Sequence, residues 1–260
     1  QYIFIGPRLS ATGSIMGYCT SKHPLKERII RYTEPLLNWR FSFLYTVCLI
    51  LFAVEPNPEY RLIVGANRDE FYSRVAEPAE LWPDESGVLG GRDKGMGGTW
   101  LGINHNGRFA AVTNFKEEPP QPLPPRSRGA LPLGFLTGKQ DPATYSQAVS
   151  EQADDYRGFN LLIADQNGVA YYCNRQSKPK VLGPGFYGLS NQALDCNWPK
   201  VSDGRIQLEQ LVQQEQSQLP ESLFKILMSS GDDREFSNSF IRGEEHGTRA
   251  ATVVLIKRNS

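Results

Sequence analysis

Short apolar segments that alternate with turn signals are the feature that most limits how this chain can fold. The clearest is residues 47–54, Val-Cys-Leu-Ile-Leu-Phe-Ala-Val, which end at the proline-rich stretch 55–60. A run of this length, rich in β-formers and stopped by prolines, is typical of a strand buried on both faces. Residues 61–66 read as a second short strand, so the two segments predict an antiparallel hairpin with residues 55–60 as its turn.

The same signals recur along the chain. Asn106-Gly107 predicts a type I′ hairpin turn, and Asn167-Gly168 marks another hairpin. Further strands are expected at residues 99–104, 108–114, 159–165, 169–174, 185–190 and 250–256.

Helices are fewer. Asp141 is expected to cap a helix that begins at Pro142 and runs to about residue 155. Two more helices are expected at 203–216 and 220–229, and residues 117–125 form a proline-rich surface loop. Without an internal repeat or a linker between domains, the pattern predicts one compact α+β domain.

Composition narrows the function classes. Twenty-eight basic residues balance twenty-eight acidic ones, so no net charge draws the chain to nucleic acid or to an acidic membrane. The cysteines are widely spaced, which argues against a disulfide framework or a zinc site and favours a reducing compartment, the cytoplasm. We expect no cofactor, no metal, and a small-molecule substrate or ligand. The oligomeric state is left open.

The first 46 residues differ from the rest, with six Lys or Arg against two Glu. A basic stretch followed by the apolar run 41–54 has the outline of a secretory signal. That run is too short for a stable membrane span, and no small-residue cleavage site follows it. The interpretation we favour is that residues 1–46 are an extension outside the fold, disordered or part of a misassigned start, and that residues 47–260 form the domain.

Cys48 has the chemistry of a nucleophile if it is the first residue of the working chain. Valine precedes it, and a GTG codon that reads as valine within a gene initiates as methionine, whose removal would leave Cys48 first. Its α-amine and thiol both titrate near neutral pH, so the amine can take the thiol proton. If Val54 pairs with Arg61, Cys48 lies opposite Asn67, beside the polar residues 67–70.

These polar residues could support attack on an amide. Arg68 would favour the thiolate, and Asp69 could hold the amine. The resulting thioester could be cleared by water, with Asn114 and Asn191 at strand ends as donors to the oxyanion. Arg249 is the remaining polar residue at a strand end.

Simpler readings stand beside this one. Cys48 in an apolar run can be a small buried hydrophobic residue, and Arg68 with Asp69 can be an ion pair that closes a hairpin. Asn114 and Asn191 can each form a turn, and Arg249 can be a solvated residue at the start of an edge strand.

Ordered motifs connect the chain to a known family. They are Cys-Leu-Ile-Leu-Phe (48–52), Ala-Asn-Arg-Asp-Glu-Phe-Tyr (66–72), Gly-Gly-Thr-Trp-Leu-Gly (97–102), Ala-Val-Thr-Asn (111–114), Arg-Ser-Arg-Gly (126–129), Gly-Phe-Asn-Leu-Leu (158–162), Tyr-Gly-Leu-Ser-Asn (187–191), Trp-Pro-Lys (198–200) and Gly-Thr-Arg (247–249). Together they resemble the NRDE family, also called the transport and Golgi organization 2 family, over about residues 47–257.

The resemblance implies a fold and a site. The family is similar in fold to the N-terminal-nucleophile hydrolases, with a four-layer αββα sandwich, and more closely to the choloylglycine-hydrolase group, which cleaves amides of bile salts and penicillin V. That group's cysteine, Arg, Asp, two Asn and late Arg fall by motif on Cys48, Arg68, Asp69, Asn114, Asn191 and Arg249. Here Cys48 is internal as the sequence stands, and Arg68 and Asp69 are adjacent, which is a departure from the group.

Two functions therefore compete. The first, which we favour, is a cysteine amidohydrolase that acts on a small linear amide. The second is a non-catalytic carrier or chaperone for haem or an acyl lipid, because members of the family are linked to haem handling, lipid homeostasis and organisation of the secretory pathway.

Overall fold

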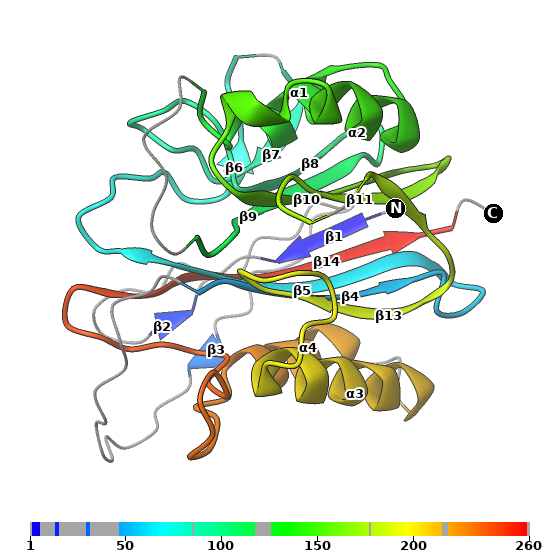
Figure 1. Cartoon of the computed structure of the whole chain (residues 1–260). Helices are drawn as coiled ribbons and strands as arrows, with labels where there is room; N and C mark the ends of the chain where they lie inside the picture. The colour runs from blue at the N-terminus through cyan, green and yellow to red at the C-terminus, as the bar shows by residue number, and fades with distance from the viewer. Residues whose placement is uncertain are drawn as a thin grey trace. The chain divides into compact units, whose positions relative to one another are not determined.

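A computed structural model gives the architecture (Figure 1). It describes residues 47–84, 86–117, 126–176, 178–214 and 218–258, and the backbone of three short strands, β1 (Tyr2–Ile5), β2 (Ser14–Ile15) and β3 (Ile30–Arg31). The other residues before Val47, and most of the expected proline-rich loop, lie outside the described residues. The chain divides into two compact units, one of residues 1–73, 185–189 and 195–260, the other of residues 74–184 and 190–194.

The first unit is built on a five-stranded antiparallel sheet in the order β1-β14-β5-β4-β13. Its longer strands are β4 (Leu49–Val54), β5 (Tyr60–Phe71), β13 (Gly185–Leu189) and β14 (His246–Lys257). Every residue of β4 is buried, as its apolar run predicts. Helices α3 (Pro199–Gln214) and α4 (Leu219–Leu227) cover one face of this sheet (Figure 1).

The first hairpin is offset by one residue from its predicted register. Val54 pairs with Leu62 instead of Arg61, so the residue opposite Asn67 is Leu49 and not Cys48. The turn is longer because Glu55 adopts a left-handed conformation, with φ of 47°, and donates its backbone N–H to Arg61 O. Cys48 therefore comes one position before the Leu49–Asn67 pair, on the side of Arg68.

Strand β5 continues through the polar residues that were expected to follow it. It does so because β14 pairs with it along this stretch, with Asn67 opposite Ala251 and Asp69 opposite Thr248. Asn67 is fully buried, and its Nδ2 donates to the carbonyls of Leu227 and Ser239, each at 2.7 Å. The polar residues 67–70 are thus fixed in a strand.

The second unit is built on a seven-stranded antiparallel sheet in the order β12-β11-β10-β9-β8-β7-β6. The strands are β6 (Glu80–Leu81), β7 (Val88–Gly90), β8 (Leu101–Asn104), β9 (Phe109–Asn114), β10 (Phe159–Asp165), β11 (Gly168–Cys173) and β12 (Lys180–Leu182). Helices α1 (Ala130–Thr137) and α2 (Pro142–Ser150) pack on this sheet (Figure 1).

Two local predictions in this unit are partly corrected. Asp141 caps α2 as expected, accepting from Thr144 N, but the helix ends at Ser150 and a 3₁₀ turn follows. Of Asn106 and Gly107, only Gly107 has a positive φ, 72°, and its N–H donates to Asn104 O. This is a type I turn completed by a left-handed glycine, whereas a type I′ turn requires positive φ at both central residues.

Each unit therefore consists of one antiparallel sheet with helices packed on it. Two sheets and two helical layers are the components of an αββα sandwich, and the predicted fold class is confirmed. In the part of the chain that the structure describes, no helix is both long and apolar enough to cross a membrane.

Candidate functional site

Cys48 lies immediately before β4, where the antiparallel hairpin brings it beside the far part of β5. The residue is partly buried, and its Sγ donates to the backbone carbonyl of Asp69 at 3.8 Å. Two of the residues predicted to act together, Cys48 and Asp69, are thus in direct contact within the first unit.

The Asp69 carboxylate is buried, with 2% of the residue exposed. Its Oδ1 accepts a hydrogen bond from Thr248 Oγ1 at 2.5 Å. Its Oδ2 is buried and has no hydrogen-bond partner among the described residues. Burial raises the pKa of this carboxyl to about 6, although the nearby charge of Lys200 and the bond from Thr248 act to lower it. The site therefore holds an acceptor atom that needs a donor.

Arg68 forms an ion pair with Glu70, the next residue but one along β5. Its Nη2 lies 3.3 Å from Glu70 Oε2. The reason is the alternation of a strand, which puts residues 68 and 70 on one face and residue 69 on the other. The charge of Arg68 still acts on the thiol, since it lowers the pKa of Cys48 as expected.

The sequence predicted that Arg68 would favour the thiolate form of Cys48, but the pKa of the thiol is raised. Burial and the charge of Asp69 outweigh Arg68, and raise the pKa of Cys48 to about 11. Burial also raises the pKa of Cys173 and of Cys196. In the chain as it stands, with Val47 attached, the Cys48 thiol is protonated near neutral pH. The three form no disulfide bond with one another, and Cys19 lies outside the described residues.

Lys200 is a further charged residue of this site. It is 3% exposed, and its Nζ donates to the backbone carbonyl of Val47 at 2.5 Å. That carbonyl belongs to the peptide bond preceding Cys48. Burial lowers the pKa of Lys200, whereas the charges of Asp69 and Cys48 act to raise it.

Sequence reasoning missed Lys200, although a signal was present. Lys200, Gly204, Leu208 and Val212 recur every four residues on α3, and all four are buried. A lysine in the apolar stripe of a helix, at its positively polarised N-terminus, is unfavourable unless anionic or carbonyl partners meet it there.

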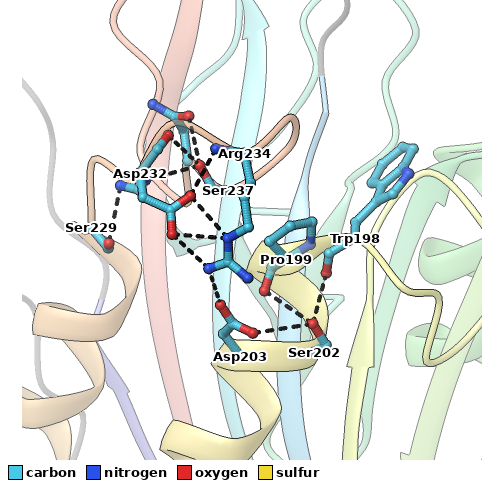
Figure 2. Close-up of polar contacts among 10 residues, drawn as sticks. Trp198, Pro199, Ser202, Asp203, Ser229, Asp232, Arg234 and Ser237 are labelled. Carbon is cyan, nitrogen blue, oxygen red and sulfur yellow. Dashed lines mark hydrogen bonds and ion pairs between the residues drawn. The ribbon is translucent and has the colours of Figure 1, made fainter.

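A polar brace, formed by the ion pairs of Arg234 with Asp232 and Asp203, joins the loop after α4 to the first turns of α3. Figure 2 shows the Arg234 guanidinium between the carboxylates of Asp232 and Asp203, with Nη2 at 2.6 Å and 2.5 Å from them. Arg234 lowers the pKa of Asp232 to about 2. The backbone N–H of Lys200 donates to Phe236 O in the same loop. A cavity beside this brace is lined by residues that include Lys200, Asp203, Ser229, Asp232, Arg234 and Ser237.

Arg249 occupies an irregular position in β14, between Thr248, opposite Asp69, and Ala250, opposite Arg68. This extra residue is a β-bulge, which re-aims a side chain. The Arg249 guanidinium donates to Phe71 O at 3.0 Å and to Tyr72 O at 3.3 Å. It lies within the strand rather than before it.

Asn114 and Asn191 belong to the second unit. Asn114 ends β9 opposite Phe159, and Asn191 follows β13 with 5% of its surface exposed. The carbonyl of Asn191 accepts from Lys116 N at 2.7 Å. The structure thus groups Cys48, Arg68, Asp69 and Lys200 in one unit and holds the two asparagines in the other.

Asn160 fixes the segment that carries Asn191. Its Nδ2 donates to Ser190 O at 3.3 Å and to Gln192 O at 3.0 Å. Its Oδ1 accepts from the hydroxyl of Tyr171 at 2.8 Å, and that hydroxyl accepts from Leu194 N at 3.1 Å.

Within the described ranges, no group of three or more His, Cys, Asp or Glu could hold a metal ion.

Comparison with known proteins places the chain. A family model described as Transport and Golgi organisation 2 matches residues 47–260. The chain belongs to this family. The Mus musculus Transport and Golgi organization 2 homolog is 34% identical over 251 residues, covering 82% of this chain and 90% of that protein. The Bos taurus homolog is 35% identical over 250 residues, covering 81% and 88%. The resemblance drawn from the ordered motifs is therefore confirmed.

Among solved structures, the chain is similar to a Caenorhabditis elegans N-acylethanolamine-hydrolyzing acid amidase ortholog. The two share 14% identity with a TM-score of 0.39, over 80% of this chain and 92% of that one. A likeness this distant carries no argument about chemistry.

Proposed function

We propose that this protein is a cysteine amidohydrolase that acts on a small linear amide, with Cys48 as its nucleophile. The observation that supports it best is the contact of the Cys48 thiol with the backbone carbonyl of Asp69, because the carboxylate of the same residue has a buried Oδ2 with no hydrogen-bond partner among the described residues. A buried carboxylate oxygen without a donor is costly, and an α-ammonium at Cys48 is a donor of the right charge.

The proposed reaction begins with transfer of the thiol proton to the α-amine of Cys48. The sulfur attacks the amide carbonyl carbon, and a C–S bond forms as the carbonyl oxygen becomes an oxyanion. The oxyanion collapses, the C–N bond breaks, and the leaving amine takes the proton from the α-ammonium. Water then hydrolyses the thioester, which releases the acid and restores the thiol.

The proposed reaction requires a free α-amine on Cys48, because this amine is the base that accepts the thiol proton. With Val47 attached, Cys48 has no amine to act as its base, and burial keeps its thiol protonated. In a chain that begins at Cys48, the amine accepts the thiol proton, and Asp69 holds the resulting ammonium. The proposal also requires a reducing compartment such as the cytoplasm, because a thiol nucleophile is lost on oxidation.

The remaining roles are proposed from the family resemblance. Asn114 and Asn191 would donate to the oxyanion, and Arg249 would orient the substrate from β14. In support, Asn191 is buried and its segment is held by Asn160. A buried donor that is held in place is what oxyanion stabilisation requires.

The test starts from protein expressed from its own gene. N-terminal sequencing is expected to give Cys48 as the first residue, and the protein is expected to hydrolyse members of a panel of small N-acyl amides. Cys48→Ser should abolish both turnover and labelling of this position by a thiol-directed electrophile. Asn191→Ala should leave labelling intact and lower turnover by about 100- to 1,000-fold.

Two results would contradict the proposal. A native first residue well upstream of Val47, without later cleavage, removes the free amine on which the mechanism depends. Failure of the wild-type thiol to react in folded protein that begins at Cys48 removes the nucleophile, and the carrier function would then be preferred.

A further inference from the structure

Lys200 is a buried charged side chain of the Cys48 cluster that the proposed reaction does not use. Its ammonium is buried on the first turn of α3, where it donates to the carbonyl of Val47 at 2.5 Å. A carbonyl oxygen and the nitrogen of the same peptide bond are about 2.3 Å apart, so Nζ lies within about 5 Å of the Cys48 nitrogen. This places a cation beside the backbone of the nucleophile.

We infer that Lys200 is a positioning residue of the Cys48 site, whose buried ammonium adds a positive charge that promotes ionisation of the thiol. The groups that face this cluster from the surrounding elements are Arg68 and Asp69 on β5, His246 on β14 and Cys196 before α3. Arg68 is engaged by Glu70, and Asp69 opposes ionisation of the thiol. Arg68 and Lys200 both act to lower the pKa of the thiol, and Lys200 is the fully buried one of the two cations that offset Asp69.

The structure around Lys200 is suited to hold a charge in place. Its backbone N–H is bound by Phe236 O, and the loop of Phe236 is joined to α3 through Arg234 and Asp203 (Figure 2). The ammonium and the backbone N–H of Lys200 are both hydrogen-bonded, and a buried charge interacts more strongly than one in water.

If the proposed function holds, Lys200 also acts on the α-amine of Cys48. In a chain that begins at Cys48 the Val47 carbonyl is gone, and the same ammonium lies beside the α-amine. Like charges this close disfavour each other, so Lys200 would lower the pKa of the α-amine and keep it neutral, in the form that accepts the thiol proton.

The test measures the rate at which iodoacetamide alkylates Cys48 in the full chain at pH 8.5, followed by mass spectrometry of the Cys48 peptide. Lys200→Met is expected to lower this rate at least about fivefold, because a nearby cation has gone. Lys200→Arg keeps the charge and should restore at least half of the wild-type rate. Lys225→Met, at an exposed lysine on α4 of the same unit, should leave the rate unchanged.

A second measurement needs only the wild-type protein. If Lys200 is held as described, acetic anhydride should modify it more slowly than Lys225 by at least about tenfold, whereas unfolded protein should show no difference. An unchanged alkylation rate in Lys200→Met, or equal acetylation of the two lysines in the folded protein, would overturn the inference. Neither measurement uses a substrate, so the absence of amide turnover would count against the proposed function alone.

Discussion

At the scale of single residues, the Asp69 carboxyl makes stability depend on pH. Burial raises its pKa from 3.8 to about 6 in the folded chain, and unfolding returns it to its ordinary value. Between roughly pH 4 and 6 the native state therefore binds more protons here than the unfolded state does. Where the native state binds more protons, the free energy of unfolding falls as pH rises, here by about 2–3 kcal/mol across the window.

Asp69→Asn is expected to remove this loss, because the amide keeps an oxygen to accept from Thr248 and has no charge to bury. The Tm of the variant minus the Tm of wild type should therefore be roughly 4–10 °C larger at pH 7.5 than at pH 4. Asp154→Asn, at an exposed aspartate, is the control and should show no such gain. A Tm difference between Asp69→Asn and wild type that is equal at both pH values would contradict the assigned burial.

Part of the site could be read from single residues. Cys48 and Asp69 were placed together because a tight hairpin brings the start of one strand to the end of the next, and a one-residue change in register preserves that neighbourhood. The ionisation of the thiol was not predictable, since it depends on burial and on Lys200, which arrives from a helix about 150 residues later in the chain.

At the scale of elements, Tyr171 ties β11 to the segment that carries Asn191. Tyr171→Phe removes a hydroxyl that serves both Asn160 and Leu194, and leaves buried polar groups without that partner. Such a loss costs about 1–3 kcal/mol, so Tm should fall by roughly 2–10 °C.

Tyr172→Phe is the matched control, because the neighbouring ring packs edge-on against Phe159 and keeps that contact without its hydroxyl. Its Tm should stay near the wild-type value in the same thermal melt. Equal melting temperatures for the two variants would show that the Tyr171 hydroxyl does not hold the segment.

Apolar runs predicted most of the longer elements, and the misses have physical causes. Strand β4 was found because all of its residues are apolar, and β10 because an apolar run precedes the turn signal Asn167-Gly168. Helix α1 was missed because Pro132 and Gly134 interrupt it, although it is stabilised by burial in the core of the second unit. The length of β5 was missed because its polar end is paired with β14, a strand from the far end of the chain.

At the scale of the whole molecule, the two units are interleaved along the sequence. Residues 185–189 belong to the first unit, residues 190–194 to the second, and the chain returns to the first unit at residue 195. Gly183-Pro184-Gly185 lies at the first of these crossings, but a Gly-Pro-Gly stretch this short reads as a turn between strands, so the sequence pattern did not reveal the interleaving. The family match, by contrast, spans both units as one continuous stretch, residues 47–260.

The last prediction concerns residues 1–46. The four residues of β1 pair with β14 at the edge of the five-stranded sheet, while the other edge of β14 is paired with β5 over nearly its whole length. Among the described residues, helices α3 and α4 pack against β4, β5, β13 and β14. Deletion of residues 1–46 should therefore lower Tm by no more than a few degrees, the shift expected for about 1 kcal/mol in a chain of this size.

Ile3→Pro is the companion variant, because proline removes a backbone N–H from β1 while the rest of the segment stays in place. Both proteins are expected to melt within a few degrees of wild type when unfolding is followed by circular dichroism. A loss of ten degrees or more on deletion, with Ile3→Pro unchanged, would show that residues before Val47 stabilise the fold by contacts other than the β1 pairing. A large loss in both variants would mean that the edge strand itself is required, and the domain would then begin well before residue 47.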